Sequence, residues 1–102
     1  MGCLATCSHD RTVRVWGLDG RSVAVLIGPN AAARACVFHP LQPLLAVAYH
    51  DGTVILWRAL EARRFATLPV GQAVIRALDY DDAGVLLAAA DDDGSLTVIL
   101  YD

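Results

Sequence analysis

Short apolar stretches separated by turn residues run along the whole chain. The segments at residues 12–16 and 53–57 are rich in β-branched and aromatic residues, which suit a pleated sheet. The longest apolar runs, such as residues 23–27 and 85–90, have the length of a strand. No stretch repeats its apolar residues every 3.6 positions over ten or more residues. The pattern therefore predicts an all-β chain of short strands.

Turn signals separate the predicted strands at regular intervals. The dipeptides Asp51-Gly52 and Asp93-Gly94 are typical of tight turns between neighbouring antiparallel strands. Glycine, proline and aspartate cluster at the remaining turns, residues 17–20, 40–43 and 81–84. Consecutive strands are therefore expected to pair with each other.

The strands and turns belong to an internal repeat. Residues 10–16 (DRTVRVW) match residues 51–57 (DGTVILW) 41 positions later, and residues 93–99 (DGSLTVI) form a weaker copy 42 positions further on. An apolar run precedes each copy. Residues 34–38 and 76–80 make a second matching pair, also 42 positions apart. Four short strands in each period of about 40 to 45 residues are typical of the blades of a β-propeller.

Residues 4–16 (LATCSHDRTVRVW) resemble the C-terminal half of a WD40 repeat almost residue for residue. The resemblance covers essentially the whole chain; it is strong in the first two copies and weak in the third. It implies antiparallel four-stranded blades of a WD40-type β-propeller, with strands a (innermost) to d (outermost), in an incomplete ring. The expected fold class is therefore all-β.

The resemblance divides the single domain, residues 1–102, into about two and a half blades. Residues 1–27 would supply strands b, c and d of a first blade, residues 28–68 a complete second blade, and residues 69–102 strands a, b and c of a third. The expected strands lie at residues 3–8, 12–16, 22–27, 34–38, 44–49, 53–58, 62–68, 74–80, 85–90 and 95–101. A seven-bladed ring would need about three times this length, so a fragment of a larger WD40 protein with no autonomous activity is an alternative.

The family stabilises each blade with a polar network. It joins a Ser or Thr of strand b, an Asp of the b–c turn, a Trp of strand c and a His before strand a. Carried over to this chain, the network residues are Ser8, Asp10 and Trp16, then Asp51 and Trp57, then Asp93 alone. Tyr49 and Asp91 stand at the Ser position of the second and third blades, and neither Gly-His pair is present. Each bond would contribute about 1 kcal/mol net, a structural role and not a catalytic one.

The resemblance also indicates where a protein or peptide partner would bind. In this family the d–a and b–c loops form one face, and partners often dock there. The positions most used are the residue before the b–c turn Asp and the early positions of strand a; here these are His9, His50, Asp92, Arg34 and Arg76. Arg and His at these positions would form charge-assisted hydrogen bonds with an acidic peptide. The alternative is a rim of solvated residues without a partner.

Composition narrows the kinds of partner. The formal net charge of −3 argues against nucleic acid, since phosphates usually require a basic patch. No apolar run approaches the length of a membrane span, and no signal peptide is visible, so no membrane partner is expected. The three cysteines form no disulfide framework, which favours a reducing, cytoplasmic location. Unpaired strands at the open blade edges would also permit self-association.

Candidate chemistry is sparse. Cys3, Cys7 and His9 share one strand parity, but a metal site usually needs four ligands, so no metal and no cofactor are expected. The aspartates at residues 81–82 and 91–93 fall in turns at opposite ends of a strand, too far apart for one calcium ion. No phosphate loop or nucleophile motif occurs. The chain is therefore expected not to be an enzyme, although an accessory propeller of a multidomain enzyme or signalling protein is a further alternative.

Overall fold

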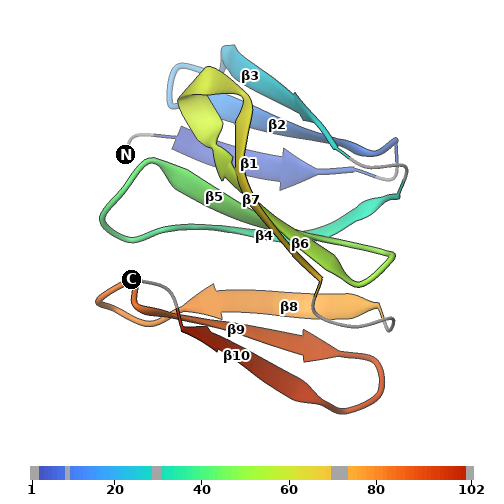
Figure 1. Ribbon diagram of the computed structural model, residues 1–102. Coiled ribbons are helices and arrows are strands. Elements are labelled where there is room, and N and C mark those ends of the chain that lie inside the picture. Colours follow the sequence, from blue (N-terminus) through green and yellow to red (C-terminus); the bar gives the residue numbers. More distant parts are fainter. Residues whose placement is uncertain (1–2, 9, 29–30, 70–73, 101–102) are drawn as a thin grey trace.

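The computed structural model describes residues 3–8, 10–28, 31–69 and 74–100 (Figure 1). The described part consists of short strands and one turn of 3-10 helix. The strands are β1 (Cys3–Cys7), β2 (Thr12–Gly17), β3 (Ser22–Ile27), β4 (Ala33–Phe38), β5 (Leu44–Tyr49), β6 (Thr53–Arg58), β7 (Arg63–Pro69), β8 (Ile75–Tyr80), β9 (Leu86–Asp91) and β10 (Leu96–Leu100), with η1 (Ala59–Glu61) between β6 and β7. Each bound lies within one residue of the strand expected from the sequence. The all-β prediction is confirmed.

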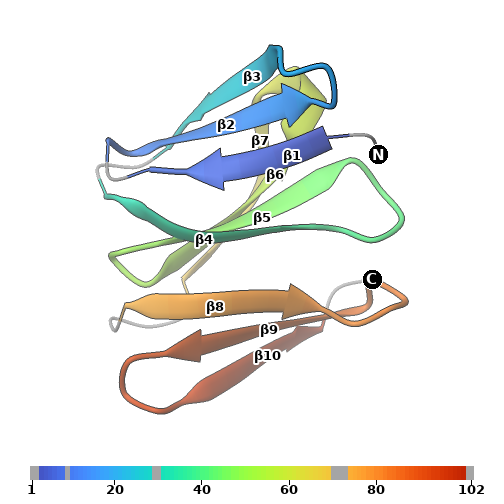
Figure 2. The same cartoon turned by 180° about the vertical axis from the view of Figure 1, so that it is seen from behind.

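The strands form three antiparallel sheets that follow the order of the chain. β1–β2–β3 make the first sheet, β4–β5–β6–β7 the second, and β8–β9–β10 the third. The three sheets stack face to face, with the four-stranded sheet between the two three-stranded ones (Figures 1 and 2). This is the arrangement of successive propeller blades, and it confirms an incomplete ring of antiparallel blades.

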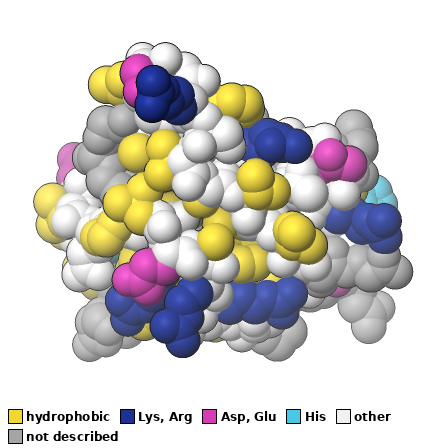
Figure 3. Space-filling view, turned by 90° about the horizontal axis from the view of Figure 1, so that it is seen from above, with side chains coloured by type: hydrophobic (Ala, Val, Ile, Leu, Met, Phe, Trp, Pro, Cys, Tyr) yellow, Lys and Arg dark blue, Asp and Glu magenta, His cyan; other side chains and the backbone are white. Residues whose placement is uncertain are grey.

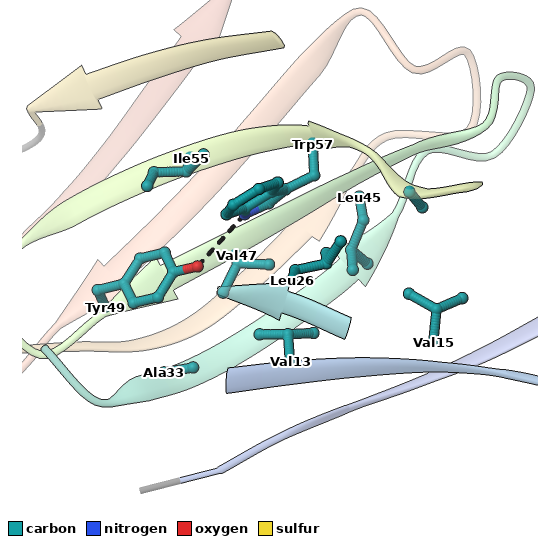
Figure 4. Close-up of a cluster of buried hydrophobic side chains, with 10 residues drawn as sticks. Val13, Val15, Leu26, Ala33, Leu45, Val47, Tyr49, Ile55 and Trp57 are labelled. Atoms are coloured by element: carbon teal, nitrogen blue, oxygen red, sulfur yellow. Dashed lines mark hydrogen bonds between the residues drawn. The ribbon is translucent and has the colours of Figure 1, made fainter. Parts of the chain in front are cut away.

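The core lies in two apolar layers, one on each side of the middle sheet. On one side Val13 and Val15 of β2 pack against Val47 of β5 and Trp57 of β6 (Figure 4). On the other side Ala46, Ala48 and Leu56 pack against the third sheet. All six residues of β5 are buried. A strand that is covered on both faces needs no alternation of apolar and polar residues. This explains the continuous apolar run at residues 44–49.

A buried histidine joins the second and third sheets. His39 lies just after β4, and its Nδ1 accepts the backbone N–H of Leu41 at 3.0 Å and of Gln42 at 3.1 Å. Its Nε2 lies 3.0 Å from the backbone oxygen of Gly84. Because Nδ1 is an acceptor, the proton sits on Nε2, which donates to Gly84. The ring also meets Tyr80 edge-on at 4.9 Å. The contact fixes the β4–β5 turn against the β8–β9 turn.

Candidate partner-binding face

The b–c turns and the segments that enter the inner strands lie at one end of all three sheets (Figure 1). Two equivalent backbone hydrogen bonds tie them together. The N–H of His50 donates to the oxygen of Ala32 at 2.8 Å, and the N–H of Asp92 donates to the oxygen of Val74 at 3.0 Å. His50 and Asp92 therefore stand beside the starts of the inner strands β4 and β8. His9 lies outside the described residues.

Arg34 and Arg76 occupy equivalent positions at β-bulges. The pairing of β4 with β5 shifts register between Ala33 and Ala35, and that of β8 with β9 shifts between Ile75 and Ala77. In each case the arginine is the extra residue, and a bulge redirects such a side chain away from the regular alternation of the strand. Both arginines therefore stand outside the regular pairing of their sheets, at the end that holds the b–c turns (Figure 1).

The two arginines line one shallow hollow. It has a volume of about 300 Å³, and Cys7, Ser8 and Ala33 complete its lining. The sequence repeat placed Arg34 and Arg76 in neighbouring blades, but it did not show that they share a hollow with the end of β1. Cys7 and Ser8 line the hollow because the first sheet packs directly beside β4.

An ion pair distinguishes the two arginines. Arg76 holds Asp92 with two hydrogen bonds, from Nε to Oδ1 and from Nη2 to Oδ2, the latter 3.1 Å long. These bonds lower the pKa of Asp92 below its ordinary value of 3.8, and the nearby charges of Arg34 and His50 lower it further. In the part of the chain that the structure describes, Arg34 has no carboxylate within ion-pair distance. Arg76 is thus neutralised by an ion pair, whereas Arg34 has no ion-pair partner among the described residues.

The lowered pKa of Asp92 determines how the pair responds to pH. A carboxylate whose pKa is lower in the folded chain stabilises the fold above its unfolded pKa and loses this effect as the pH falls through the folded value. The Arg76–Asp92 pair is therefore fully formed at neutral pH and weakens only in acid below about pH 3.8.

Asp10 and Asp51 stabilise their turns by local hydrogen bonds. Each accepts the backbone N–H two residues later, from Thr12 and Thr53, at 3.0 Å. The hydroxyl and the N–H of Thr12 also lower the pKa of Asp10. In the third sheet the same task falls to Asp91, which accepts the N–H of both Asp93 and Ser95 at 3.0 Å. The expected role of Asp93 is thus performed by its neighbour two residues earlier.

The tryptophan bonds differ from the expected network as well. Trp16 donates to the hydroxyl of Thr6 at 3.0 Å, and Ser8 instead accepts the N–H of Asp10 at 3.3 Å. Thr6 and Trp16 point to the same face of the sheet, so the indole reaches Thr6 directly.

In the middle sheet the indole of Trp57 donates to the hydroxyl of Tyr49 at 3.3 Å (Figure 4). Burial raises the pKa of Tyr49, since its charged form would be desolvated. A methyl group at Gly28 would lie 2.4 Å from the Tyr49 hydroxyl oxygen. The glycine of the lost Gly-His pair is therefore needed here to make room for a larger side chain.

The described cysteines are unpaired, and nothing groups them as a metal site. Cys36 is half-buried, and burial together with the neighbouring Cys7 raises its pKa to about 12. Among the described residues, no three His, Cys, Asp or Glu side chains lie close enough to hold a metal ion. No helix in the described ranges is long and apolar enough to cross a membrane.

Comparison with known proteins agrees with this architecture. The WD40 family (WD domain, G-beta repeat) matches residues 2–17 and 20–58, more than half of the chain. The protein transport protein sec13 of Aspergillus fumigatus is 31% identical over 96% of the chain, which spans 38% of that relative. The WD repeat, SAM and U-box domain-containing protein 1 of Gallus gallus is 36% identical over 71% of the chain, equal to 16% of its own length.

Solved structures show the same fold. The WD40 domain of Toxoplasma gondii coronin superposes with a TM-score of 0.88 over 98% of the chain, at 25% identity; the match covers 28% of the coronin chain. The computationally designed Ika4 protein gives a TM-score of 0.85 over the whole chain at 22% identity, with 62% of Ika4 covered. These matches agree with the repeat period, the stacked antiparallel sheets and the turn aspartates. The chain therefore belongs to the WD40-repeat family.

Proposed function

We propose that this chain is a non-catalytic protein–protein interaction scaffold that binds an acidic peptide segment in the hollow between Arg34 and Arg76. One observation carries the proposal: Arg34 projects from a bulge into the hollow and has no carboxylate partner among the described residues. A guanidinium forms two parallel hydrogen bonds with a carboxylate, which gives both energy and orientation. A Glu or Asp of the peptide that reaches Arg34 would form a second ion pair, beside the one that Asp92 already makes with Arg76.

Asp92 has a second role in this proposal. Its negative charge holds Arg76 in place, yet it also opposes any incoming anion. A peptide carboxylate therefore gains most from Arg34 and only shares Arg76. The remaining lining, Cys7, Ser8 and Ala33, is small and leaves the hollow open to an extended segment.

The relatives support a scaffold role at the level of the whole protein. The chain spans only 38% of a sec13 protein, named for protein transport, and 12% of the nuclear distribution protein PAC1 of Ajellomyces capsulatus, 37% identical over 53% of the chain. Both names describe cellular processes and not reactions. We extend to this chain only the role of holding a protein partner, in a reducing, cytoplasmic setting that suits its unpaired thiols.

The test is binding of a fluorescein-labelled peptide rich in glutamate, followed by fluorescence anisotropy. Replacing both Arg34 and Arg76 with alanine is expected to weaken binding by about ten- to thirtyfold, since each exposed charge contributes up to about 1 kcal/mol. The Arg21→Ala variant is the matched control, because Arg21 is an exposed arginine that pairs with Asp19 in the β2–β3 turn. Unchanged affinity in the double variant, both for the peptide and for every protein captured by the full chain, would contradict the proposal.

Replacing Asp92 with asparagine tests the same site from the opposite direction. The change removes the competing charge and releases Arg76, so the affinity for the acidic peptide is expected to rise by about three- to tenfold. Asparagine keeps the size of the side chain, and the bond from the Asp92 N–H to Val74 does not depend on the carboxylate. Weaker binding in this variant would show that Asp92 helps to hold the ligand, which the proposal excludes.

A further inference from the structure

A groove crosses the end of the middle sheet that lies opposite the b–c turns. It runs between the β4–β5 turn and η1, and hydrogen bonds fix both walls. The N–H of Ala59, at the start of η1, donates to the oxygen of Pro43 at 3.3 Å, and the ring of His39 holds the β4–β5 turn. Described sheets cover both faces of the middle sheet. The groove is therefore a preformed feature between two turns and not the bare face of a blade.

Two adjoining hollows make up the groove. The larger has a volume of about 290 Å³, and its apolar lining consists of Pro43, Leu44, Leu60 and Phe65. The second, of about 220 Å³, shares Pro43 and Leu60 with the first and continues to Leu41. Small-molecule pockets usually start at about 300 Å³. Two smaller hollows side by side suit neighbouring side chains of an extended peptide instead.

Two residues of the larger hollow are specific to the middle sheet. Arg58 is the last residue of β6, whereas the last residue of β2, at the same repeat position, is Gly17. Phe65 is the extra residue of a β-bulge between β6 and β7, and the equivalent bulge of the first sheet has the smaller Val23. The first blade pairs its strands without an arginine or an aromatic ring at these positions. The fold of a blade therefore does not account for Arg58 and Phe65.

Positive charge borders the apolar lining. The guanidinium of Arg58 lies over the ring of Phe65, 5.0 Å from its centre, and the exposed Arg63 and Arg64 follow on β7. Figure 3 shows arginine side chains in a row along the lower edge of the view, the side on which β7 lies. Among the described residues that line the larger hollow, only Glu61 is acidic. None of the three arginines has a carboxylate within ion-pair distance in the described part of the chain.

We propose that this groove binds an extended segment of a partner protein, with a large apolar side chain between Leu60 and Phe65 and a neighbouring carboxylate on Arg58. The apolar side chain supplies most of the affinity, since it leaves water while exposed ion pairs contribute little. The arginines select acidic neighbours. A segment of glutamates alone lacks the apolar anchor and meets the charge of Glu61, so it is not a ligand of the groove. This site lies at the opposite end of the sheets from Arg34 and would hold a second segment, independently of the first.

The experiment measures binding of a fluorescein-labelled peptide, a leucine-phenylalanine pair flanked by aspartates, by fluorescence anisotropy. Leu60→Asp places a charge in the apolar lining and is expected to weaken binding by at least about tenfold. Arg58→Gln keeps the length of the side chain but loses the charge, and about threefold weaker binding is expected. Leu18→Asp is the matched control, because Leu18 is an exposed leucine of the β2–β3 turn and the variant gains the same charge. This control should bind as the wild type does.

Two further measurements separate this groove from the hollow at the other end of the sheets. The variant with both Arg34 and Arg76 replaced by alanine should keep its affinity for this peptide. A peptide with serines in place of the leucine-phenylalanine pair should lose binding by at least about tenfold, because its carboxylates remain but its anchor is gone. Far-ultraviolet circular dichroism checks that each variant is folded, and Phe65→Ser replaces Leu60→Asp if that variant is not.

Three results would overturn the proposal. The first is no binding of the peptide up to about 1 mM chain. The second is equal weakening by Leu18→Asp and Leu60→Asp, which would reduce the effect to net charge. The third is loss of binding in the Arg34 and Arg76 double variant, which would place the peptide in the other hollow.

Discussion

Gly84→Ala is expected to lower the free energy of unfolding by about 2–5 kcal/mol, from backbone strain and overpacking together. Gly84 has a φ of +73°, where a side chain is strained. A methyl group there would also lie 2.3 Å from Cε1 and Nε2 of His39. The imidazole cannot retreat easily, because it is buried and bonded to the N–H groups of Leu41 and Gln42. The change should therefore loosen the contact between the second and third sheets.

Gly94→Ala separates the two causes. Gly94 has a similar φ of +81°, but an added methyl group would meet nothing within 4 Å. This variant should lose only the backbone contribution, about 1 kcal/mol. The measurement is urea denaturation of both variants, followed by circular dichroism. Equal losses for Gly84→Ala and Gly94→Ala would show that His39 does not occupy the position described.

Trp57→Ala is expected to cost about 3–5 kcal/mol in the free energy of unfolding, the usual range for a large core side chain. Trp57 is only 3% exposed and packs between the first and middle sheets. Its loss would open a cavity beside Val47 and leave the buried hydroxyl of Tyr49 without its bond to the indole. For a chain of 102 residues this is a large part of the total stability.

Trp16 is the matched control because it occupies the same repeat position. It lies on the face of the first sheet that points away from the middle sheet, where no described sheet covers it, and its bond to Thr6 is exposed to solvent. Trp16→Ala should therefore cost only about 1 kcal/mol. Denaturation of the two variants at low protein concentration compares them directly. A loss for Trp16 as large as that for Trp57 would mean that a further sheet covers the first one.

The repeat period made the strands predictable because each strand has its own turn signals. Asp51-Gly52 and Asp93-Gly94 mark turns by local chemistry, and the apolar run at residues 44–49 has the length of a covered strand. The bulges that place Arg34 and Arg76 in the hollow were not predictable. Residues 33–35 and 75–77 read as ordinary strand, and one extra residue in a pairing leaves no local signal.

The polar contacts were less predictable, because several residues of one type stand close enough in sequence to make the same hydrogen bond. Residues 91–93 are three successive aspartates, and only the geometry of the turn assigns one to the backbone and another to Arg76. The contact between His39 and Gly84 joins positions 45 residues apart. Tyr49 replaces a smaller residue of the family pattern, yet its longer side chain still reaches Trp57.

The most direct test of the peptide site is an amide NMR titration of the ¹⁵N-labelled chain with the glutamate-rich peptide. We expect the signals of Ser8, Ala33, Arg34 and Arg76 to shift together, since these residues line one hollow. The signals of Leu41 and Gln42, in the turn at the opposite end of the sheets, should stay in place. Shifts confined to that opposite end, or no shifts at millimolar peptide, would contradict the assignment of this face as the binding site.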